Sequence, residues 1–374
     1  MRTVNIKKEL KNVYAVILVG GRGKRFWPVS RLTRPKPFLK IAGQKKTLIA
    51  ETFERAKAIV SKENIVFVAN VRHVSAIKKE FPRVRDANII REPVGRNTTA
   101  AIALAAAVLK KRNRACIMAV MPADQLIPDR SEFRDTLRDA VIAVCRENAL
   151  VLFGLRPRYP STEFGYIKKG KRIVLRSYRS KRSITKVLSF TEKPDAEGAK
   201  RFLRSGNYLW NSGIFVWRAE TILDNIRRYE PSIGKGIDEI ARTIGTKDFQ
   251  SQLRKRFSRL NNISIDYSVL QRSRQTVCIE SDFSWQDVGS WNNMENLFDR
   301  DRSGNISLGE CVLHNTGNSI AMSDEGHLIG LCGVSEVVVI RSKNATLVCK
   351  KDAAHEVRHL VEKIEKNIKY RKYL

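Results

Sequence analysis

The sequence predicts an α/β fold: a Rossmann-like, mixed and mainly parallel sheet flanked by helices, then a small β-rich C-terminal domain with a terminal helix. Three observations predict it. Short apolar runs rich in β-branched residues alternate with helical segments between residues 13 and 155. Continuous apolar strands of this kind are typical of parallel sheets covered on both faces. From residue 299 onward short β-segments and turns replace this alternation, and residues 353–370 have the pattern of a closing helix.

The elements of the first part follow in order. We expect strands at the runs VYAVILV, NIVFVAN, ANII, ACIMAVM and ALVLFG, and helices at 47–60, 97–111 and 131–148. Ligands of such folds bind beyond the carboxyl ends of the strands, where a glycine turn and the tripeptide PAD at 122–124 both fall. No proline-rich linker precedes the mixed region after 155, so we assign residues 1–300 to one domain and 301–374 to the second.

Length and composition limit the class of protein. A chain of 374 residues with 43% apolar residues is long enough for two packed domains. The longest apolar runs are too short to cross a bilayer, and the N-terminus lacks the apolar segment of a secretion signal. The six cysteines are dispersed, with no CxxC pair, which favours reduced, structural thiols. We therefore expect a cytoplasmic protein without a membrane partner.

The formal net charge of +32 has two interpretations. A surface that binds nucleic acid is one, because basic residues concentrate between 156 and 186. A solvated, strongly basic face is the other. No recognition-helix pattern, base-stacking motif or zinc-finger spacing accompanies the charge, so we expect no specific nucleic-acid partner.

A glycine turn surrounded by cations follows the first predicted strand. Its glycines are Gly20, Gly21 and Gly23, and its cations are Arg22, Lys24, Arg25, Arg31, Arg34 and Lys36. The spacing fits neither a Walker A loop nor a dinucleotide-binding GxGxxG. Backbone N–H groups in such a turn can converge on phosphate, which predicts a site for a strongly anionic ligand. Taken alone, the loop is better explained as an ordinary tight turn with solvated cations.

The glycine turn begins the motif GGRGKRFWPVSRLTRPKPFL, and further motifs follow it along the chain. In order they are EPVGRNTTAAIALAA, MPADQLI, EFGYIKKG, FTEKPD, YLWNSGIFVW, SIDYSVL and WQDVGSW. Together they resemble the signature of the sugar-1-phosphate nucleotidyltransferases, and more narrowly that of the mannose-1-phosphate guanylyltransferases. The resemblance covers nearly the whole chain and leaves no room for the isomerase domain that longer relatives append. It implies the nucleotidyltransferase fold and the short, single-function form of the enzyme.

The resemblance implies that GTP and mannose 1-phosphate are converted to GDP-mannose and pyrophosphate, in the biosynthesis of polysaccharide precursors. The attacking phosphate oxygen is already anionic, so positioning and charge neutralisation carry the catalysis rather than a general base. The cations of the glycine turn would then shield the triphosphate. The family also implies Mg²⁺ as the cofactor and a homodimer formed through the C-terminal region.

Four residues are implied as catalytic. Arg25 would face the nucleotide phosphates, and Lys36 would bridge phosphates near the reacting centre. Asp124 of the PAD tripeptide and Asp287 of WQDVGSW match the metal pair of the family. Hard Mg²⁺ takes few carboxylates and completes its shell with phosphate oxygens and water. Each aspartate alone is also compatible with a structural role, as a cap after a strand or as a turn former before Gly289.

The nucleotide and the sugar phosphate are implied to contact separate segments. Nucleotide-binding residues would be Gly20, Gly21, Gly23, Arg25, Arg96, Asn97, Thr98 and Asp124. Sugar-phosphate-binding residues would be Gly165, Tyr166, Glu192, Lys193, Asn211 and Asp266. Asn97 has a structural interpretation as well, since asparagine favours helix caps, and Lys193 is also compatible with a solvated loop lysine.

Small departures from the family pattern leave alternatives open. Arg22 and Lys24 replace small or hydroxyl residues, Pro37 replaces a commoner glutamine, and Phe164 replaces a glycine. They bear on substrate choice rather than on the reaction. The same chemistry with another hexose 1-phosphate or nucleoside triphosphate is one alternative. A non-catalytic regulatory homologue and a nucleic-acid-binding protein are two others.

Overall fold

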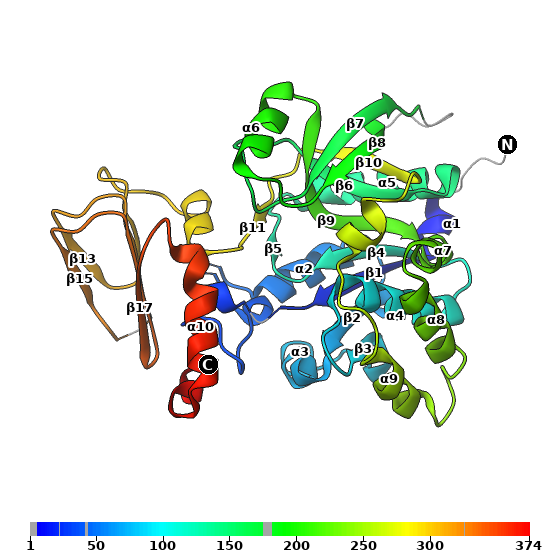
Figure 1. The fold of residues 1–374 in the computed structure, drawn as a ribbon, viewed down its shortest axis with the longest axis horizontal. Helices are drawn as coiled ribbons and strands as arrows, with labels where there is room; N and C mark the ends of the chain where they lie inside the picture. Colours follow the sequence, from blue (N-terminus) through cyan, green and yellow to red (C-terminus); the bar gives the residue numbers. More distant parts are fainter. Residues whose placement is uncertain (1–5, 22, 42–43, 175–181, 325) are drawn as a thin grey trace. The chain divides into compact units, whose positions relative to one another are not determined.

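The computed structural model describes residues 6–21, 23–41, 44–174, 182–324 and 326–374, and the chain forms two compact units (Figure 1). Unit 1 consists of Met1–Gly20, Thr52–Ala123 and Ile127–Trp285, and unit 2 of Gly21–Glu51, Asp124–Leu126 and Gln286–Leu374. This division differs from the boundary at residue 300 expected from the sequence. The reason is packing: Phe26, Trp27 and Leu39 share one buried apolar cluster with Ile306, Val338 and Val361.

Unit 1 is built on one nine-stranded sheet with the order β3-β2-β1-β4-β9-β6-β10-β8-β7. Strands β3, β2, β1 and β4 pair in parallel, as do β6 and β10, whereas β8 and β9 run antiparallel to their neighbours. The predicted mixed, mainly parallel sheet is thus confirmed. The strands are β1 (Val13–Val19), β2 (Ile65–Asn70), β3 (Ile89–Glu92), β4 (Ile117–Pro122), β6 (Leu150–Leu155), β7 (Tyr166–Arg172), β8 (Ile184–Thr191), β9 (Tyr208–Arg218) and β10 (Thr276–Ser281).

Helices cover both faces of this sheet because successive strand residues point to opposite sides. Val66 and Leu152 pack into a cluster with α4 (Asn97–Arg112), α7 (Ala219–Tyr229), α8 (Pro231–Ala241) and α9 (Phe249–Phe257). Phe153, the residue after Leu152 in β6, points to the opposite face and packs against Phe133 of α5 (Arg130–Glu147). The remaining helices are α1 (Ile6–Leu10), α2 (Leu48–Lys57), α3 (Val74–Glu80) and α6 (Ala196–Ser205).

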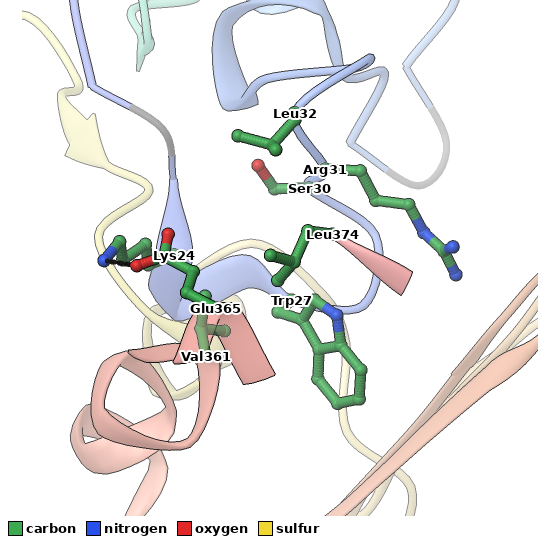
Figure 2. A pocket seen from close by; sticks show the side chains of 8 residues that line it. All are labelled: Lys24, Trp27, Ser30, Arg31, Leu32, Val361, Glu365 and Leu374. Carbon is green, nitrogen blue, oxygen red and sulfur yellow. Dashed lines mark hydrogen bonds and ion pairs between the residues drawn. The ribbon is translucent and has the colours of Figure 1, made fainter. Parts of the chain in front are cut away.

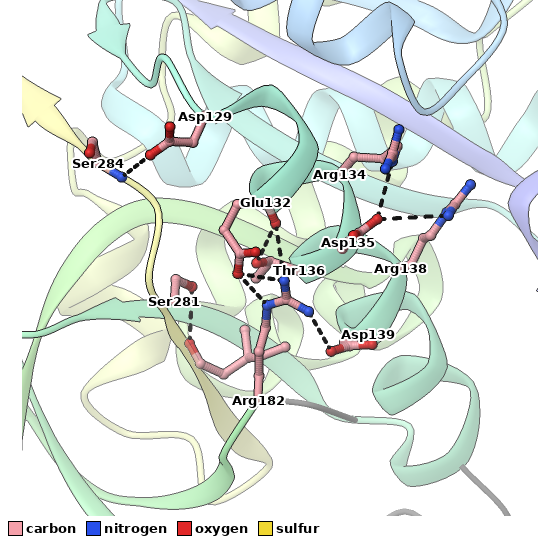
Figure 3. Close-up of polar contacts among 11 residues, drawn as sticks. Asp129, Glu132, Arg134, Asp135, Thr136, Arg138, Asp139, Arg182, Ser281 and Ser284 are labelled. Carbon is pink, nitrogen blue, oxygen red and sulfur yellow. Dashed lines mark hydrogen bonds and ion pairs between the residues drawn. The ribbon is translucent and has the colours of Figure 1, made fainter. Parts of the chain in front are cut away.

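A buried ion-pair network fastens α5 to the start of β8 (Figure 3). The guanidinium of Arg182 donates to Glu132 (Nε to Oε1, 3.0 Å) and to Asp139 (Nη1 to Oδ2, 3.1 Å). The side chains of Arg182 and Asp139 are only 8% and 4% exposed, so each charge depends on its partner.

Unit 2 contains short strands and a terminal helix (Figure 1). Strands β12 (Ile306–Leu308), β14 (Ile320–Ser323) and β16 (Val337–Ser342) pair in parallel, and β17 (Ala345–Lys350) joins β16 antiparallel. Strands β13 (Cys311–His314) and β15 (Ile329–Cys332) form a second parallel pair. Successive strands therefore alternate between two parallel sheets, which is the pattern of a β-helix.

The predicted terminal helix is shorter than 353–370. Helix α10 spans Val357–Lys366 and is followed by a 3₁₀ turn, η9 (Ile368–Tyr373). The helix ends there because Asn367 leaves the helical conformation, and its side chain accepts a hydrogen bond from the backbone N–H of Lys369. Among the described residues, the helices fall short of the length and apolarity needed to cross a bilayer.

Candidate active site

Three charged side chains that are far apart in the sequence meet within unit 2. The Nζ of Lys36 lies 2.8 Å from Oδ2 of Asp124 and 3.6 Å from Oδ1 of Asp287. The Lys36 side chain is 8% exposed, while the two carboxylates are 29% and 35% exposed. Burial by itself lowers the pKa of Lys36, but the two carboxylates together outweigh it and raise the pKa. The ammonium group is therefore held charged.

A short sheet aligns the two aspartates. Asp124 directly precedes β5 (Gln125–Leu126), and Asp287 ends β11 (Gln286–Asp287). The two strands pair antiparallel, with Gln125 opposite Asp287. The backbone carbonyl of Asp287 accepts hydrogen bonds from Gly289 N–H (2.7 Å) and Asn293 Nδ2 (2.8 Å). These bonds fix the backbone that carries the second carboxylate.

The glycine turn packs directly on Lys36. Gly23 has φ of 64°, and a Cβ built on it would lie 2.6 Å from Cβ of Lys36 and 2.8 Å from Oγ of Ser30. A side chain at this position is therefore excluded by both conformation and space. Gly21 also has a positive φ (79°) but faces open space, as does the exposed Gly20 at the end of β1 in unit 1.

The cations of this loop have different surroundings. Arg25 is half-buried in the 3₁₀ turn η1 (Lys24–Phe26), and Arg34 is exposed. Lys24 instead pairs with Glu365 of α10 (Nζ to Oε2, 2.9 Å). Buried Arg31 donates to Oδ1 of Asn344 and to the carbonyl oxygen of Ser342, both at 2.9 Å. Lys24 and Arg31, which the sequence groups with the cations expected to shield an anionic ligand, are thus bonded to protein acceptors in this structure. Arg22 lies outside the described residues.

Five of the six predicted sugar-phosphate residues lie together in unit 1. Asn211 donates from Nδ2 to Oδ1 of Asp266 (3.0 Å), and Lys193 pairs with Glu192. A Cβ on Gly165 would lie 2.5 Å from Oε2 of Glu192, so glycine makes room for that carboxylate. Burial raises the pKa of Asp266 to about 6, and the negative charge of Glu192 adds to the effect.

Local backbone geometry in this cluster is unusual at two positions. Lys193 has φ of 48°, a left-handed conformation that is rare for residues other than glycine. Asp266 begins a single π-helical turn, Asp266–Leu270, and such turns are frequent at functional sites. The predicted neighbour Tyr166 is different: its side chain is fully buried, and its ring packs 5.3 Å from that of Phe202.

The predicted nucleotide segment forms the start of α4. Asn97 is exposed with φ of 61°, and its Oδ1 accepts a hydrogen bond from the N–H of Thr98 (2.8 Å), but Arg96 rather than Asn97 occupies the N-cap position of α4. Arg96 donates to the carbonyl oxygen of Ser258. The hydroxyl of Thr98 accepts from the N–H of Ile265 (2.8 Å). The start of α4 is therefore tied to the turn that carries Asp266.

Sequence reasoning missed two features of unit 1. Glu92 ends β3 with 8% exposure, and burial raises its pKa to about 7. The sequence signal that could have indicated this buried carboxylate is its position two residues after the apolar run ANII. Thr99 and Ser268 are fully buried, and their hydroxyls lie 2.8 Å apart, which adds a second link between α4 and the Asp266 turn. A threonine in an alanine-rich helix gives little indication of such a contact.

Comparisons with known proteins show which family this chain resembles. The family model for "Nucleotidyl transferase" matches residues 14–303, and that for "MannoseP isomerase/GMP-like beta-helix domain" matches residues 309–364. A mannose-1-phosphate guanylyltransferase of Escherichia coli is 34% identical over 94% of this chain and 75% of its own length, and one of Klebsiella pneumoniae is 34% identical over 94% and 74%. The chain thus spans about three quarters of these relatives.

A solved structure is similar over almost its entire length. It is described as a "mannose-1-phosphate geranyltransferase" from Thermus thermophilus, is 32% identical, and covers 95% of this chain and 99% of its own, with a TM-score of 0.82. The resemblance inferred from the motifs is confirmed by these matches. On the strength of the matched family model and the relatives at 34% identity, this chain belongs to the nucleotidyltransferase family.

Proposed function

We propose that this protein is a mannose-1-phosphate guanylyltransferase, which converts GTP and mannose 1-phosphate to GDP-mannose and pyrophosphate. The observation that carries the proposal is the position of Lys36 between Asp124 and Asp287 with Gly23 packed against it. The names of the E. coli and K. pneumoniae relatives supply the sugar and the nucleotide.

The reaction needs phosphate binding more than proton transfer. An oxygen of the sugar phosphate forms a bond to the α-phosphorus of GTP, and the bond from that phosphorus to the oxygen bridging to the β-phosphorus breaks. The electron pair leaves with pyrophosphate. Because the attacking oxygen is already anionic, no side chain has to remove a proton. The charged ammonium of Lys36 offsets negative charge on the phosphates, and Arg25 adds a second cation from the same loop.

The carboxylates of Asp124 and Asp287 fit a magnesium ion. Both offer hard oxygen ligands, and both remain about one-third exposed, so they are accessible from solvent. Across the described residues, no group of three His, Cys, Asp or Glu side chains could hold a metal. A pair of carboxylates suits Mg²⁺, which usually completes its shell with phosphate oxygens and water. When bound, Mg²⁺ would supply further neutralisation of phosphate charge.

We assign the sugar phosphate to the cluster in unit 1. The carboxylate of Glu192 and the amide of Asn211 provide the acceptors and donors that sugar hydroxyls require. Lys193 has the charge to bind the sugar phosphate, and its side chain is 54% exposed. Asp266 orients Asn211 through the hydrogen bond at 3.0 Å. Because Tyr166 is fully buried, it supports this cluster by packing rather than by contact with the ligand.

We assign the nucleotide to the glycine turn and the start of α4. The open space at Gly20 and Gly21 lets a ligand approach the backbone closely. Asn97 is the exposed residue of the Arg96–Thr98 segment, and its Oδ1 bonds locally to the N–H of Thr98, whereas Arg96 and Thr98 are bonded to the distant residues Ser258 and Ile265. In this assignment Asn97 contacts the ligand, and Arg96 and Thr98 fix the backbone that presents it.

Pyrophosphate release tests the proposal. GTP, UTP, ATP and CTP are each combined with mannose 1-phosphate and with glucose 1-phosphate in the presence of Mg²⁺. We expect the highest kcat/KM for GTP with mannose 1-phosphate. A different preferred pair would identify another nucleotidyltransferase, and no release with any pair would indicate a non-catalytic homologue. The expected homodimer is tested separately by light scattering, with twice 42.6 kDa as the predicted mass.

A further inference from the structure

The end of the chain lies against the glycine turn within unit 2. Figure 2 shows Lys24 of the turn joined to Glu365 of α10. The Nζ of Lys24 lies 2.9 Å from Oε2 of Glu365 and 3.6 Å from Oε1 of Glu362. Two carboxylates of one helix thus surround the cation that stands between Gly23 and Arg25 in the sequence.

Trp27 makes a second connection to the same region. Its indole Nε1 donates to the carbonyl oxygen of Tyr373 (2.9 Å), in the turn after α10. Its own carbonyl oxygen accepts a hydrogen bond from Nε1 of Trp291 (3.2 Å), four residues beyond Asp287. Trp27 is 7% exposed and shares its apolar cluster with Val361 of α10. The turn is therefore held from the terminal segment as well as from the segment that carries Asp287.

We propose that α10 and the turn after it are a clamp that fixes the glycine turn for nucleotide phosphates, with Lys24 and Glu365 as its positioning residues. The inference rests on the proposed function, in which this turn binds GTP. The clamp holds Gly23 and Arg25 in place through the residue between them. In this proposal Lys24 binds Glu365 and does not bind the triphosphate.

The clamp would strengthen nucleotide binding because ordering glycine residues costs conformational entropy. Gly21 and Gly23 both have positive φ, and glycine loses more backbone freedom on ordering than any other residue. If the turn were loose in the free protein, binding of phosphate would have to supply that ordering. Contacts made within the protein before binding remove this cost, so they strengthen nucleotide binding without touching the nucleotide.

The pair is well suited to a separate test. The side chains of Lys24 and Glu365 are 26% and 27% exposed, and ion pairs this accessible contribute little to global stability. Loss of the pair should therefore change nucleotide binding more than folding. If Lys24 instead bound phosphate directly, Glu365→Gln would leave binding unchanged or improve it, and a reversed pair would not function.

The experiment compares Glu365→Gln, Lys24→Met and the reversed pair Lys24→Glu/Glu365→Lys in the full chain. The control is Glu197→Gln, which removes the exposed Lys200–Glu197 pair (3.0 Å) of α6. We expect Glu365→Gln to raise the KM for GTP about two- to fivefold, with kcat and the KM for mannose 1-phosphate within about twofold. The reversed pair should restore the KM for GTP in part, because Glu362 remains beside position 24, and the control should leave the KM unchanged.

Amide hydrogen exchange gives a readout that does not depend on turnover. The backbone N–H groups of residues 23–31 should exchange faster in Glu365→Gln than in the unchanged protein, and the reversed pair should restore their protection. Unchanged exchange together with an unchanged KM for GTP would overturn the clamp. If the protein released no pyrophosphate with any substrate, the proposed function would fail, while the exchange of residues 23–31 would still decide whether the clamp exists.

Discussion

The ammonium nitrogen of Lys36 lies 2.8 Å from a carboxylate oxygen of Asp124, although 88 residues separate the two in the sequence. Asp287 approaches the same nitrogen from a third segment, and the pairing of Asp287 in β11 with Gln125 in β5 brings it beside Asp124. A buried cation between two accessible carboxylates is an arrangement suited to binding phosphate oxygens and a divalent cation.

Removal of the cation should disable phosphate transfer. In Lys36→Met the charge between Asp124 and Asp287 is lost, and a group that acts electrostatically on the transition state typically accounts for a factor of roughly 10²–10³ in kcat. We expect a fall of that order in pyrophosphate release. The matched control is Lys40→Met, an exposed lysine four residues further along the chain, which should remain near full activity. Equal effects of the two substitutions would contradict the role assigned to Lys36.

Gly23 should not tolerate a side chain. In Gly23→Ala the new Cβ meets Lys36 and Ser30 at a left-handed backbone conformation, so the free energy of unfolding should fall by about 1–3 kcal/mol. Chemical denaturation measures this change. Gly20→Ala, where a Cβ meets open space, should leave stability within about 0.5 kcal/mol. Comparable losses for both variants would show that the close approach to Lys36 is unimportant.

Arg182→Met should destabilise unit 1 without affecting the chemistry. The change removes the cation that Arg182 supplies to the buried carboxylate of Asp139, and breaking a buried pair in this way costs about 3–5 kcal/mol. Thermal unfolding should show a large loss for Arg182→Met and little change for Arg134→Met, whose side chain is 39% exposed beside Asp135. If Arg182→Met unfolded at the unchanged temperature, the network in Figure 3 would not be a structural tie.

Glu92 should make stability depend on pH. Burial raises its pKa from 4.5 to about 7, so the folded state holds a proton that the unfolded state releases. Stability from this group is therefore present below pH 4.5 and is lost as pH rises through 7. A glutamine at position 92 cannot ionise, so Glu92→Gln should not lose stability at high pH. The free energy of unfolding of this variant should exceed that of the unchanged protein by roughly 3 kcal/mol at about pH 8, but not at about pH 5.

The exposed Glu197 provides the control for that measurement, since its side chain is 71% exposed and its partner is a lysine, Lys200, rather than a histidine. Glu197→Gln should differ from the unchanged protein by the same small amount at both pH values. A Glu92→Gln variant with no advantage at the higher pH would indicate that the carboxylate is stabilised by a ligand or contact in solution.

The sequence predicts the first half of unit 1 well because its signals are local. The run VYAVILV at 13–19 coincides with β1, and the alanine-rich segment 97–111 differs from α4 by one residue, since continuous apolar strands and strong helix formers need no distant information. Strands β12 to β17, three to six residues each, carry too little periodicity to reveal a β-helix.

Long-range packing could not be read from the sequence. The pairing of Lys24 with Glu365 joins residues 341 positions apart, and the same packing places the glycine turn in unit 2 rather than in a domain ending at residue 300. The convergence of Asp124 and Asp287 was expected only through family resemblance, because no spacing rule connects two such distant aspartates. Physical reasoning from the residues alone predicted an anion-binding turn but not its partners.

The most direct test of the central claim is the rate of pyrophosphate release by Asp287→Asn with GTP and mannose 1-phosphate. The substitution keeps the size of the side chain but removes the charge that faces Lys36. Circular dichroism of the variant serves as the control for an intact fold. We predict a loss of at least about 100-fold in kcat/KM. Release at the unchanged rate by a folded Asp287→Asn protein would contradict the assignment of Asp124, Lys36 and Asp287 as the phosphate-transfer centre.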